Sequence, residues 1–190
     1  MTKTPETSVP MTALLTARWS PRSFDESFEI SDQQVLAILE AGRWAPSSNN
    51  GQPWRFSVAK RGSELHDKVV AGLTGFNQGW APAAAALIVV SVKKAEDGSS
   101  HKGNFYDAGL AVSQMSIQAQ SMDLYTHQMG GILHDELHKS LELPDDLEVA
   151  VVFTVGKKDT PEKFEGSALE RELGPRTRAD LSEIVLHGKP

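Results

Sequence analysis

Two short runs rich in β-branched residues limit the folds open to this chain. Residues 87–92 read LIVVSV and residues 149–155 read VAVVFTV. Continuous apolar runs of this length are typical of strands that are buried on both faces of a sheet. We therefore predict that both runs form central strands, with a third strand at residues 55–59.

Helical patterns alternate with these strands. Ser31 is placed to cap a helix whose apolar positions recur at helical spacing until Pro46 stops it. The longest predicted helix covers residues 104–122, and its apolar positions spread around more than one face. We expect both of its faces to be covered, one of them by a second subunit. Shorter helices are predicted at residues 11–17, 63–73 and 133–141.

The C-terminal segment has a different character. From residue 160 onward it is predicted to be a largely irregular tail with little to form a core of its own. It nevertheless ends on the apolar residues Leu181, Ile184, Val185 and Leu186. We expect this end to add a strand to a neighbouring sheet, in its own subunit or in a partner. Residues 124–129 are predicted to be a short connection or a strand.

The composition narrows the class of protein. A chain of 190 residues with 39% hydrophobic and 23% charged residues is expected to form one globular domain over residues 11–190, after a flexible N-terminus at residues 1–10. A net charge of −6 argues against a nucleic-acid or anionic-membrane partner. The absence of cysteine excludes disulfides, thiolate metal sites and cysteine nucleophiles. With no apolar run long enough to cross a bilayer, we expect a soluble cytoplasmic protein.

The stretch 45–56, APSSNNGQPWRF, is an unusual loop. Pro46 ends the preceding helix, the serines and asparagines can hydrogen-bond locally, and Gly51 with Pro53 fixes a bend before the next strand. Such a loop is either an ordinary turn or a polar cradle for a ligand, since binding groups concentrate on loops between rigid elements. Its composition alone leaves both readings open.

Other catalytic motifs are weak or absent. His134 and His138 are spaced as zinc ligands on a helix, but the residue after the first histidine is Asp135 and not the glutamate of zinc proteases. No metal site is therefore expected. The glycines at 72, 75 and 79 miss the dinucleotide-binding spacing, and no G-x-S-x-G hydrolase motif occurs.

Five motifs in order carry a family resemblance. They are R-x-S-x-R-x-F at residues 18–24, APSSNNGQPWRF at 45–56, F-N-Q-x-W at 76–80, a Gly-Gly pair at 130–131, and P-R-x-R at 175–178. Together they resemble the FMN-dependent nitroreductase family from residue 18 to the tail. The resemblance implies an α+β fold with a central, mostly antiparallel mixed sheet wrapped by helices. It also implies an intertwined homodimer, with exchanged C-terminal tails and two FMN molecules at its interface.

The resemblance also implies roles for individual residues. Three arginines resemble the clamp on the FMN phosphate, Arg22 resembles a basic residue at the N1 and C2 edge of the flavin, and Asn77 resembles a contact to its pyrimidine end. Residues 128–131 resemble the segment beside the ring, and residues of the 45–56 loop resemble the group that reaches the FMN of the other subunit. The implied cofactor-binding residues are Arg18, Trp19, Ser20, Arg22, Pro46, Ser47, Ser48, Asn50, Asn77, Gln128, Met129, Gly130, Gly131, Arg176 and Arg178.

The chain also departs from the family pattern. Trp80 stands where longer members place a basic side chain, and Gly130 stands where a glutamate is often found. The connection between residues 93 and 103 is too short for the helical excursion that covers the substrate in longer members. We therefore expect an open pocket, with Trp80 and Met129 as its apolar walls.

These features predict an FMN-dependent NAD(P)H oxidoreductase. NAD(P)H would act as a transient electron donor, and flat acceptors such as nitroaromatics and quinones would be reduced by ping-pong hydride transfer. The flavin N5 would carry the chemistry, so no catalytic side chain is expected. Two alternatives stay open, a specialised flavin enzyme of the same fold, catalysing dehalogenation or flavin fragmentation, and a flavin-binding protein without turnover.

Overall fold

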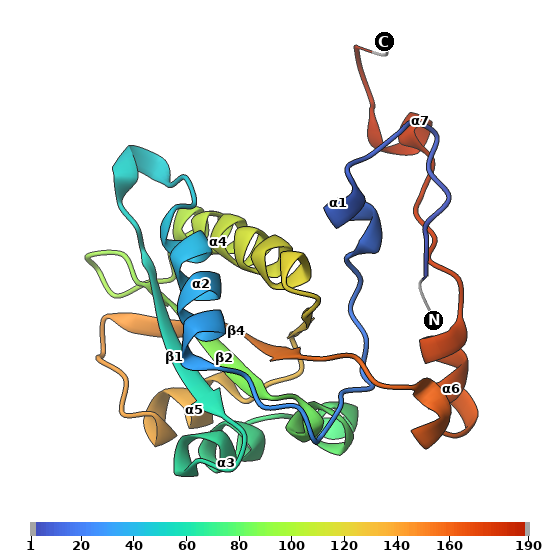
Figure 1. Cartoon of the computed structure of the whole chain (residues 1–190). Helices are drawn as coiled ribbons and strands as arrows, with labels where there is room; N and C mark the ends of the chain where they lie inside the picture. Colours follow the sequence, from blue (N-terminus) through green and yellow to red (C-terminus); the bar gives the residue numbers. More distant parts are fainter. Residues whose placement is uncertain (1–2, 189–190) are drawn as a thin grey trace.

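The computed structural model describes residues 3–188 of the chain. The first two residues of the expected flexible N-terminus and the last two of the expected tail lie outside the described residues. The chain forms a body around a sheet and an arm beside it, in which segments from the two ends of the chain run together (Figure 1). We use "the arm" for residues 3–17 and 161–188.

The sheet has four strands in the order β1-β2-β4-β3. All three pairings are antiparallel, and the β2–β4 ladder shifts register between Val90 and Ser91. The two central strands are therefore the two β-branched runs, which confirms the prediction. No parallel pair occurs in the described sheet, so the parallel part of the predicted mixed sheet is not seen. The strands are β1 (Trp54–Lys60), β2 (Ala86–Lys93), β3 (Tyr125–Met129) and β4 (Leu147–Gly156).

Helices cover both faces of this sheet. Along β2 the side chains alternate, so that Ile88 and Val90 join a core with α2 (Asp32–Arg43) and α4 (Lys102–Ser121). Leu87 and Val89 join a second core on the other face, which is covered by α3 (Glu64–Ala71) and α5 (His134–Ser140). Successive residues of a central strand point into different apolar layers, one on each face of the sheet. Both sets must be apolar, so the central strands appear in the sequence as continuous hydrophobic runs.

Local signals explain the helix boundaries. Ser31 begins α2 with a capping box, in which its side chain accepts from the backbone N–H of Gln34 and the Gln34 side chain accepts from the backbone N–H of Ser31. Ser63 caps α3 by a single bond, in which its side chain accepts from the backbone N–H of His66. A side chain at Gly42 would place its Cβ 2.7 Å from Met115 Sδ, so glycine is needed for the close approach of α2 and α4.

The α4 helix buries one stripe of side chains against the sheet and α2, among them Ala108, Val112 and Met115. Its opposite side carries exposed residues such as Tyr106 and Ser113. The expected cover on that second side is not present within one chain. None of the helices in residues 3–188 is both long and apolar enough to cross a membrane.

The tail is more helical than the sequence predicted. It contains α6 (Gly166–Leu173) and α7 (Leu181–Ile184), and α7 replaces the strand that we expected from its apolar residues. Helix α1 (Ala13–Ala17) lies beside this segment in the arm (Figure 1). Short 3-10 turns complete the chain at Ser48–Asn50, Gly75–Gly79, Ala81–Ala83 and Pro161–Lys163.

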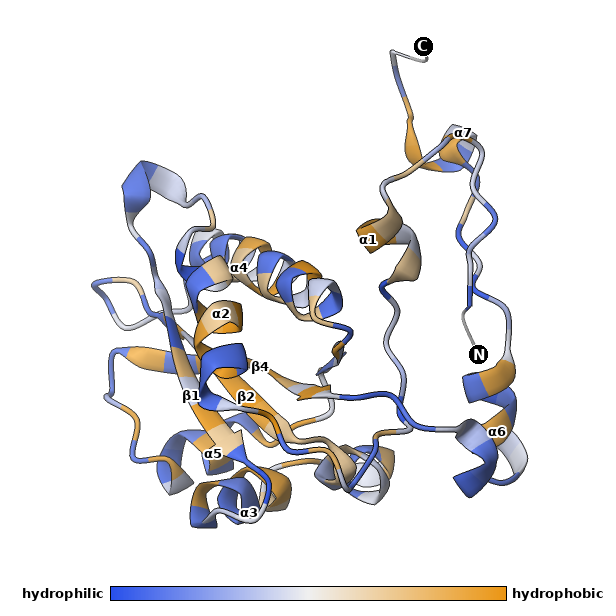
Figure 2. Ribbon diagram, in the orientation of Figure 1, coloured by the Kyte–Doolittle hydropathy of each residue, from blue (hydrophilic) through white to orange (hydrophobic). Residues whose placement is uncertain are grey.

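The arm carries an apolar surface that its own chain does not cover. Orange, apolar positions stand out on α1 and α7 in Figure 2. The exposed apolar side chains of the arm are Val9, Met11, Leu14, Leu15, Leu173, Leu181, Ile184 and Leu186.

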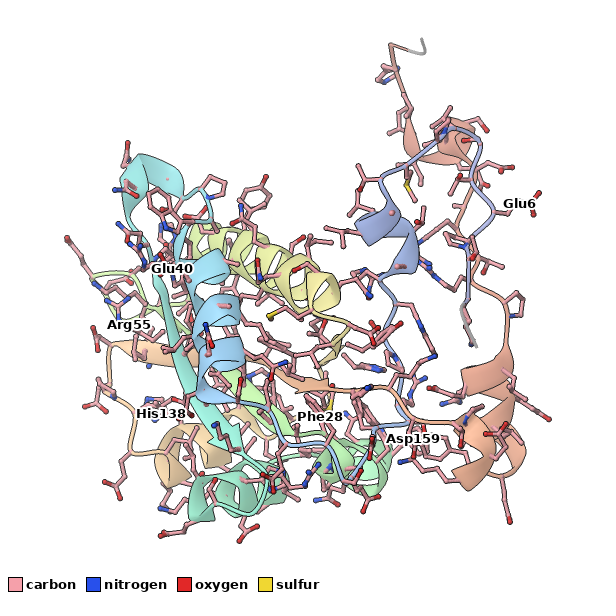
Figure 3. The ribbon with its side chains drawn as sticks, in the orientation of Figure 1. Glu6, Phe28, Glu40, Arg55, His138 and Asp159 are labelled. Carbon is pink, nitrogen blue, oxygen red and sulfur yellow. The ribbon has the colours of Figure 1, made fainter. Side chains whose placement is uncertain are left out.

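Polar contacts tie the arm to the body where the chain leaves β4, near Asp159 (Figure 3). The N–H of Asp159 donates to the carbonyl of Ser23 at 3.0 Å, and the Ser23 hydroxyl donates to the carbonyl of Thr160. Phe24 forms an antiparallel bridge with Lys158 and accepts a hydrogen bond from Lys163 through its carbonyl. The segment that follows α1 is thereby held against the root of the tail.

Candidate functional site

Three guanidinium groups from distant parts of the chain gather between the arm and the body. Arg18 follows α1, and Arg176 and Arg178 follow α6. Burial lowers the pKa of Arg18, and the positive charge of Arg178 lowers it further. Burial also lowers the pKa of Arg176, and the positive charges of Arg18 and Arg178 lower it further. The structure thus brings together the three arginines that the sequence assigned to one clamp.

No carboxylate of the described chain forms an ion pair with these arginines. Arg18 Nη1 lies 3.5 Å from the Ser20 hydroxyl, to which it donates. Arg176 donates to the backbone carbonyls of Lys3 and Thr16, and Arg178 donates to the carbonyl of Thr177. Positive charges held together without a counter-charge fit an anionic group, and planar guanidinium forks suit a phosphate.

A cavity of about 460 Å³ opens beside Arg18. Its floor is the side of α4 that carries Ala108, Val112 and Ser116, with the side chain of Gln128 from β3. Gln128 Nε2 donates to the Ser116 hydroxyl at 2.8 Å, so this amide is fixed in position. The volume lies in the range of small-molecule sites. The other lining residues are Phe105, Gly109, Ser113, Ala150 and Val151.

Arg22 belongs to a second group of residues, at the point where the arm meets the body. Its guanidinium lies 5.9 Å from the centre of the Phe76 ring and 6.0 Å from that of Trp80, distances at which a cation attracts an aromatic face. Burial lowers the pKa of Arg22, while the charge of Glu172 raises it. Trp19, next in sequence to Arg18, packs edge-on against Tyr125 at 6.4 Å.

Asn77 and Gly131 meet close to this group. Asn77 Nδ2 donates to the carbonyl of Gly131 at 3.2 Å, and the N–H of Thr74 donates to the same carbonyl at 3.0 Å. A Cβ at Gly131 would lie 2.9 Å from Asn77 Nδ2 and 3.0 Å from Thr74 Oγ1. A side chain at 131 would therefore push the ends of the Asn77 and Thr74 side chains aside, whereas a Cβ at Gly130 would meet nothing.

The prediction that Trp80 and Met129 form apolar walls of the pocket is wrong. Trp80 and Met129 are each only 2% exposed, and both belong to the core that α3 and α5 cover. Trp80 stacks on Phe24 with ring centres 6.3 Å apart and tilts over His127 at 4.6 Å. Their side chains face inward and cannot touch a bound acceptor. Phe105 is the aromatic residue among those that line the cavity.

The 45–56 loop lies apart from the arginines within one chain. Figure 1 shows the 3-10 turn at Ser48–Asn50 at the opposite side of the body from the arm. The loop is fixed to α4, because the N–H of Ser48 donates to Asp107 Oδ2 at 3.0 Å and Asp107 is buried. Asn49 and Asn50 have positive φ angles of 50° and 54°, a backbone shape that asparagine tolerates well. Pro46, Ser47, Ser48 and Asn50 therefore do not join the arginine group of their own chain.

Two residues of the site escaped the sequence analysis. Glu172 is buried beside Arg22, and His127 binds the segment between Arg18 and Arg22 through Nδ1 and the carbonyl of Pro21 at 3.1 Å. Burial, with the charge of Arg22, lowers the pKa of His127 to about 4, although the hydrogen bonds that the ring donates to the backbone carbonyls of Pro21 and Ser20 oppose the shift. The sequence offers no sign of either contact, because both join segments that are far apart in the chain.

The histidine pair of α5 forms no metal centre. His134 Nδ1 bonds the carbonyl of Val149 at 2.7 Å and His138 Nε2 bonds that of Pro144 at 3.1 Å. Within residues 3–188 no group of three or more potential metal ligands comes together. Figure 3 shows His138 on α5, on the side of the body away from the arm.

Comparisons with known proteins show the family to which the chain is related. The model of the Nitroreductase family matches residues 15–73 and 64–157. An uncharacterized 15.4 kDa protein of Mycolicibacterium smegmatis is 30% identical over 142 residues, which cover 71% of this chain and 96% of that protein. An oxygen-insensitive NADPH nitroreductase of Helicobacter acinonychis is 33% identical over 120 residues, which cover 61% of this chain and about half (56%) of that enzyme.

The fold has solved counterparts as well. A crystal structure described as an oxidoreductase containing FMN superposes with a TM-score of 0.89 at 32% identity, over 97% of this chain and 95% of that one. The likeness extends over nearly the whole chain and therefore includes the arm. It confirms the predicted fold class.

Proposed function

The chain belongs to the nitroreductase family, and on that basis we propose that it is an FMN-dependent NAD(P)H oxidoreductase. The observation that carries this proposal is the group formed by Arg18, Arg176 and Arg178, which share one place without a carboxylate partner in the described chain. A phosphate supplies the missing charge. The relative that contains FMN supports the identity of the cofactor.

The residues of the site fit FMN in two further ways. Gly131 presents bare backbone beside Asn77, where a Cβ would be in collision, and a flat ring can approach such a surface closely. The guanidinium of Arg22 lies 5.9 Å from the ring of Phe76, the neighbour of Asn77 in the sequence, and we propose that its positive charge faces the pyrimidine edge of the flavin. When bound, FMN would supply the redox chemistry, namely hydride transfer between NAD(P)H and an acceptor. The residues of the chain would bind the cofactor, orient it and supply positive charge around it.

We propose that nitroaromatics and quinones are the acceptors. The connection between β2 and α4, residues 94–101, contains a turn and no helix, as the sequence predicted. Without a lid, a flat acceptor can reach the same place as the nicotinamide, so the two must bind in turn. Steady-state rates at several NAD(P)H concentrations should then give parallel double-reciprocal lines. Intersecting lines would show a ternary complex and contradict the single binding face.

Cofactor identity has a direct test. The protein should purify yellow, and mass analysis of the released cofactor should give FMN. Release of FAD instead would contradict the phosphate role of the arginines, because an adenylate would occupy the place of the terminal phosphate.

We also propose that the protein is a homodimer whose subunits exchange contacts through the arm. The exposed apolar residues of the arm and the distance of the 45–56 loop from its own arginines support this arrangement. A permanent pair of this kind buries more than about 2,000 Å². Light scattering should give twice the chain mass of 20.7 kDa. A folded, flavin-loaded monomer would overturn the dimer.

A further inference from the structure

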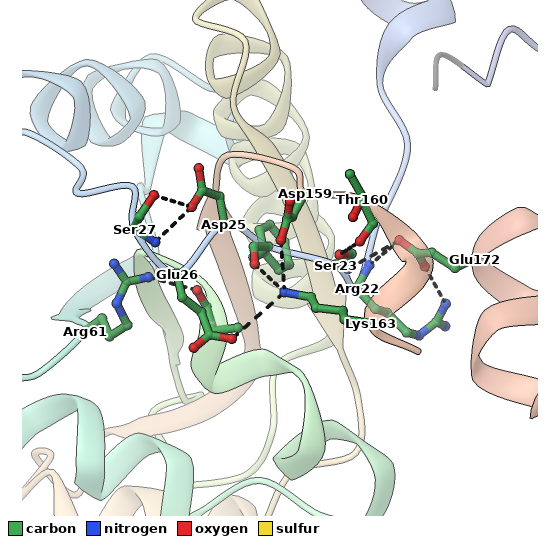
Figure 4. Close-up of polar contacts among 12 residues, drawn as sticks. Arg22, Ser23, Asp25, Glu26, Ser27, Arg61, Asp159, Thr160, Lys163 and Glu172 are labelled. Atoms are coloured by element: carbon green, nitrogen blue, oxygen red, sulfur yellow. Dashed lines mark hydrogen bonds and ion pairs between the residues drawn. The ribbon is translucent and has the colours of Figure 1, made fainter. Parts of the chain in front are cut away.

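Glu172 is a buried carboxylate at the point where the arm meets the body. Its side chain is 2% exposed. One oxygen, Oε1, accepts the backbone N–H groups of Arg22 at 2.9 Å and Ser23 at 3.3 Å (Figure 4). Through these two bonds α6 fixes the backbone of the segment that carries Arg22.

The second oxygen of Glu172 has a different environment. Oε2 is buried and has no hydrogen-bond partner, and it lies 3.9 Å from Arg22 Nη1. Burying a carboxylate is costly unless a cation lies close to it. Arg22, with a side chain that is 25% exposed, is one such cation. Lys3 is a second, because burial lowers its pKa while the charge of Glu172 raises it. The guanidinium of Arg22 is held between Glu172, Phe76 and Trp80.

This pairing affects the charge that Arg22 presents to the proposed cofactor. Two-electron reduction of a flavin with uptake of one proton leaves the ring with one negative charge. A nearby positive charge stabilises that form, and a carboxylate behind the guanidinium weakens the effect. The strength of the field at the ring thus depends on both residues.

We propose that Glu172 is a positioning residue that fixes Arg22 and partly offsets its charge, and that it thereby lowers the reduction potential of bound FMN. This inference rests on the proposed function, and specifically on Arg22 facing the pyrimidine edge of the flavin.

The test compares the midpoint potential of the FMN-loaded protein with that of Glu172→Gln. The amide oxygen of glutamine can still accept the N–H groups of Arg22 and Ser23, so the variant removes the charge and keeps the acceptor. Reduced FMN should bind about tenfold more tightly relative to oxidised FMN. For a two-electron couple, this change raises the potential by about 30 mV. Glu170→Gln is the matched control, because Glu170 is exposed on the same helix, and it should leave the potential unchanged.

A second pair of variants tests the route through Arg22. In an Arg22→Gln background, replacing Glu172 by Gln should shift the potential less than it does in the native protein, because only the direct effect of the Glu172 charge is then left and its hold on Arg22 is absent. An equal shift in both backgrounds would show that Glu172 acts through its charge alone and would overturn its role in positioning Arg22. A potential in Glu172→Gln no different from that in Glu170→Gln would also overturn it.

Two outcomes keep the inference separate from the proposed function. A native protein that binds no FMN refutes the proposed function itself, whereas FMN binding with an unchanged potential in Glu172→Gln refutes only the role of Glu172. If Glu172→Gln fails to fold, Glu172→Asp retracts the carboxylate from the guanidinium while keeping the charge in the core. The midpoint potential of Glu172→Asp should rise by less than about 30 mV, which is a less than tenfold change in the ratio of reduced to oxidised FMN affinity. An unchanged potential would refute the proposal.

Discussion

Replacing Arg178 by Ala should weaken FMN binding while leaving the fold intact. Among residues 3–188, Arg178 donates only to the carbonyl of its neighbour Thr177, so its removal breaks no hydrogen bond between elements of that part of the chain. Its charge lowers the pKa of both Arg18 and Arg176, which means that it repels them in the apo protein. The side chain is thus unfavourable to its neighbours until an anion is bound.

The size of the effect follows from the bonds lost. A charge-assisted hydrogen bond contributes about 1.5 to 3 kcal/mol, and each 1.4 kcal/mol is about a tenfold change in Kd. Arg178→Ala should therefore raise the Kd for FMN by roughly 10- to 100-fold. Because repulsion is relieved, the melting temperature of the apo variant should be unchanged or slightly higher.

Fluorescence titration of apo protein with FMN, paired with thermal unfolding, measures both effects. Arg171→Ala is a suitable control, because Arg171 is an exposed arginine on α6 of the same arm, and its loss should change the Kd by less than about threefold. Native-like affinity in Arg178→Ala would remove Arg178 from the phosphate site. A loss of affinity together with a lower apo melting temperature would show that the residue acts through the fold.

Three further changes probe the body of the protein. His127 has a folded pKa of about 4 against 6.5 for the free side chain, so protonation favours the unfolded state, and stability should fall by about 2 kcal/mol between pH 7 and pH 5. Urea unfolding should show this loss in the native protein and not in His127→Phe. Asp107→Ala leaves the N–H of Ser48 without its acceptor and should lower stability by about 1 to 3 kcal/mol. It should also weaken FMN binding if the loop completes a site, and unchanged binding would exclude that role. Gly131→Ala places a Cβ 2.9 Å from Asn77 Nδ2, so the amide must move and its hydrogen bond to the carbonyl of Gly131 is weakened. The same unfolding assay should show a loss of about 0.5 to 1.5 kcal/mol.

The sequence predicted the helices and strands of the body well, because the residues that determine each element lie within it or directly beside it. The capping residue Ser31, the stop at Pro46 and the β-branched runs each act within a few residues of the structure they determine. The absence of a helix from the connection after β2 could be predicted from the small number of residues in that connection. These elements needed no knowledge of what they pack against.

The site was less accessible to the sequence because its contacts join distant segments. Arg18 and Arg178 could be assigned to one group only through the order of motifs in a known family. Helix α6 was missed because its first residue is Gly166 and no side chain caps it, so it lacks the usual signals of a helix start. Glu172 reads as a surface residue until the backbone of Arg22 is placed beside it.

The inward position of Trp80 and Met129 has a similar cause. Trp80 lies in a turn between two 3-10 segments, where periodicity does not indicate which way a side chain points. Its place in the core depends on stacking against Phe24, which comes from the segment after α1. Tertiary packing therefore removed both predicted walls from the pocket.

Anaerobic titration of the FMN-loaded protein with NADPH and NADH tests the central claim most directly. If the protein is an NAD(P)H oxidoreductase, at least one nucleotide should bleach the visible absorption of the bound flavin, and a nitroaromatic or quinone should restore it. Flavin that stays oxidised with both nucleotides, in protein shown to be folded and fully loaded, would contradict the oxidoreductase and leave a flavin-binding protein or a specialised flavin enzyme in its place.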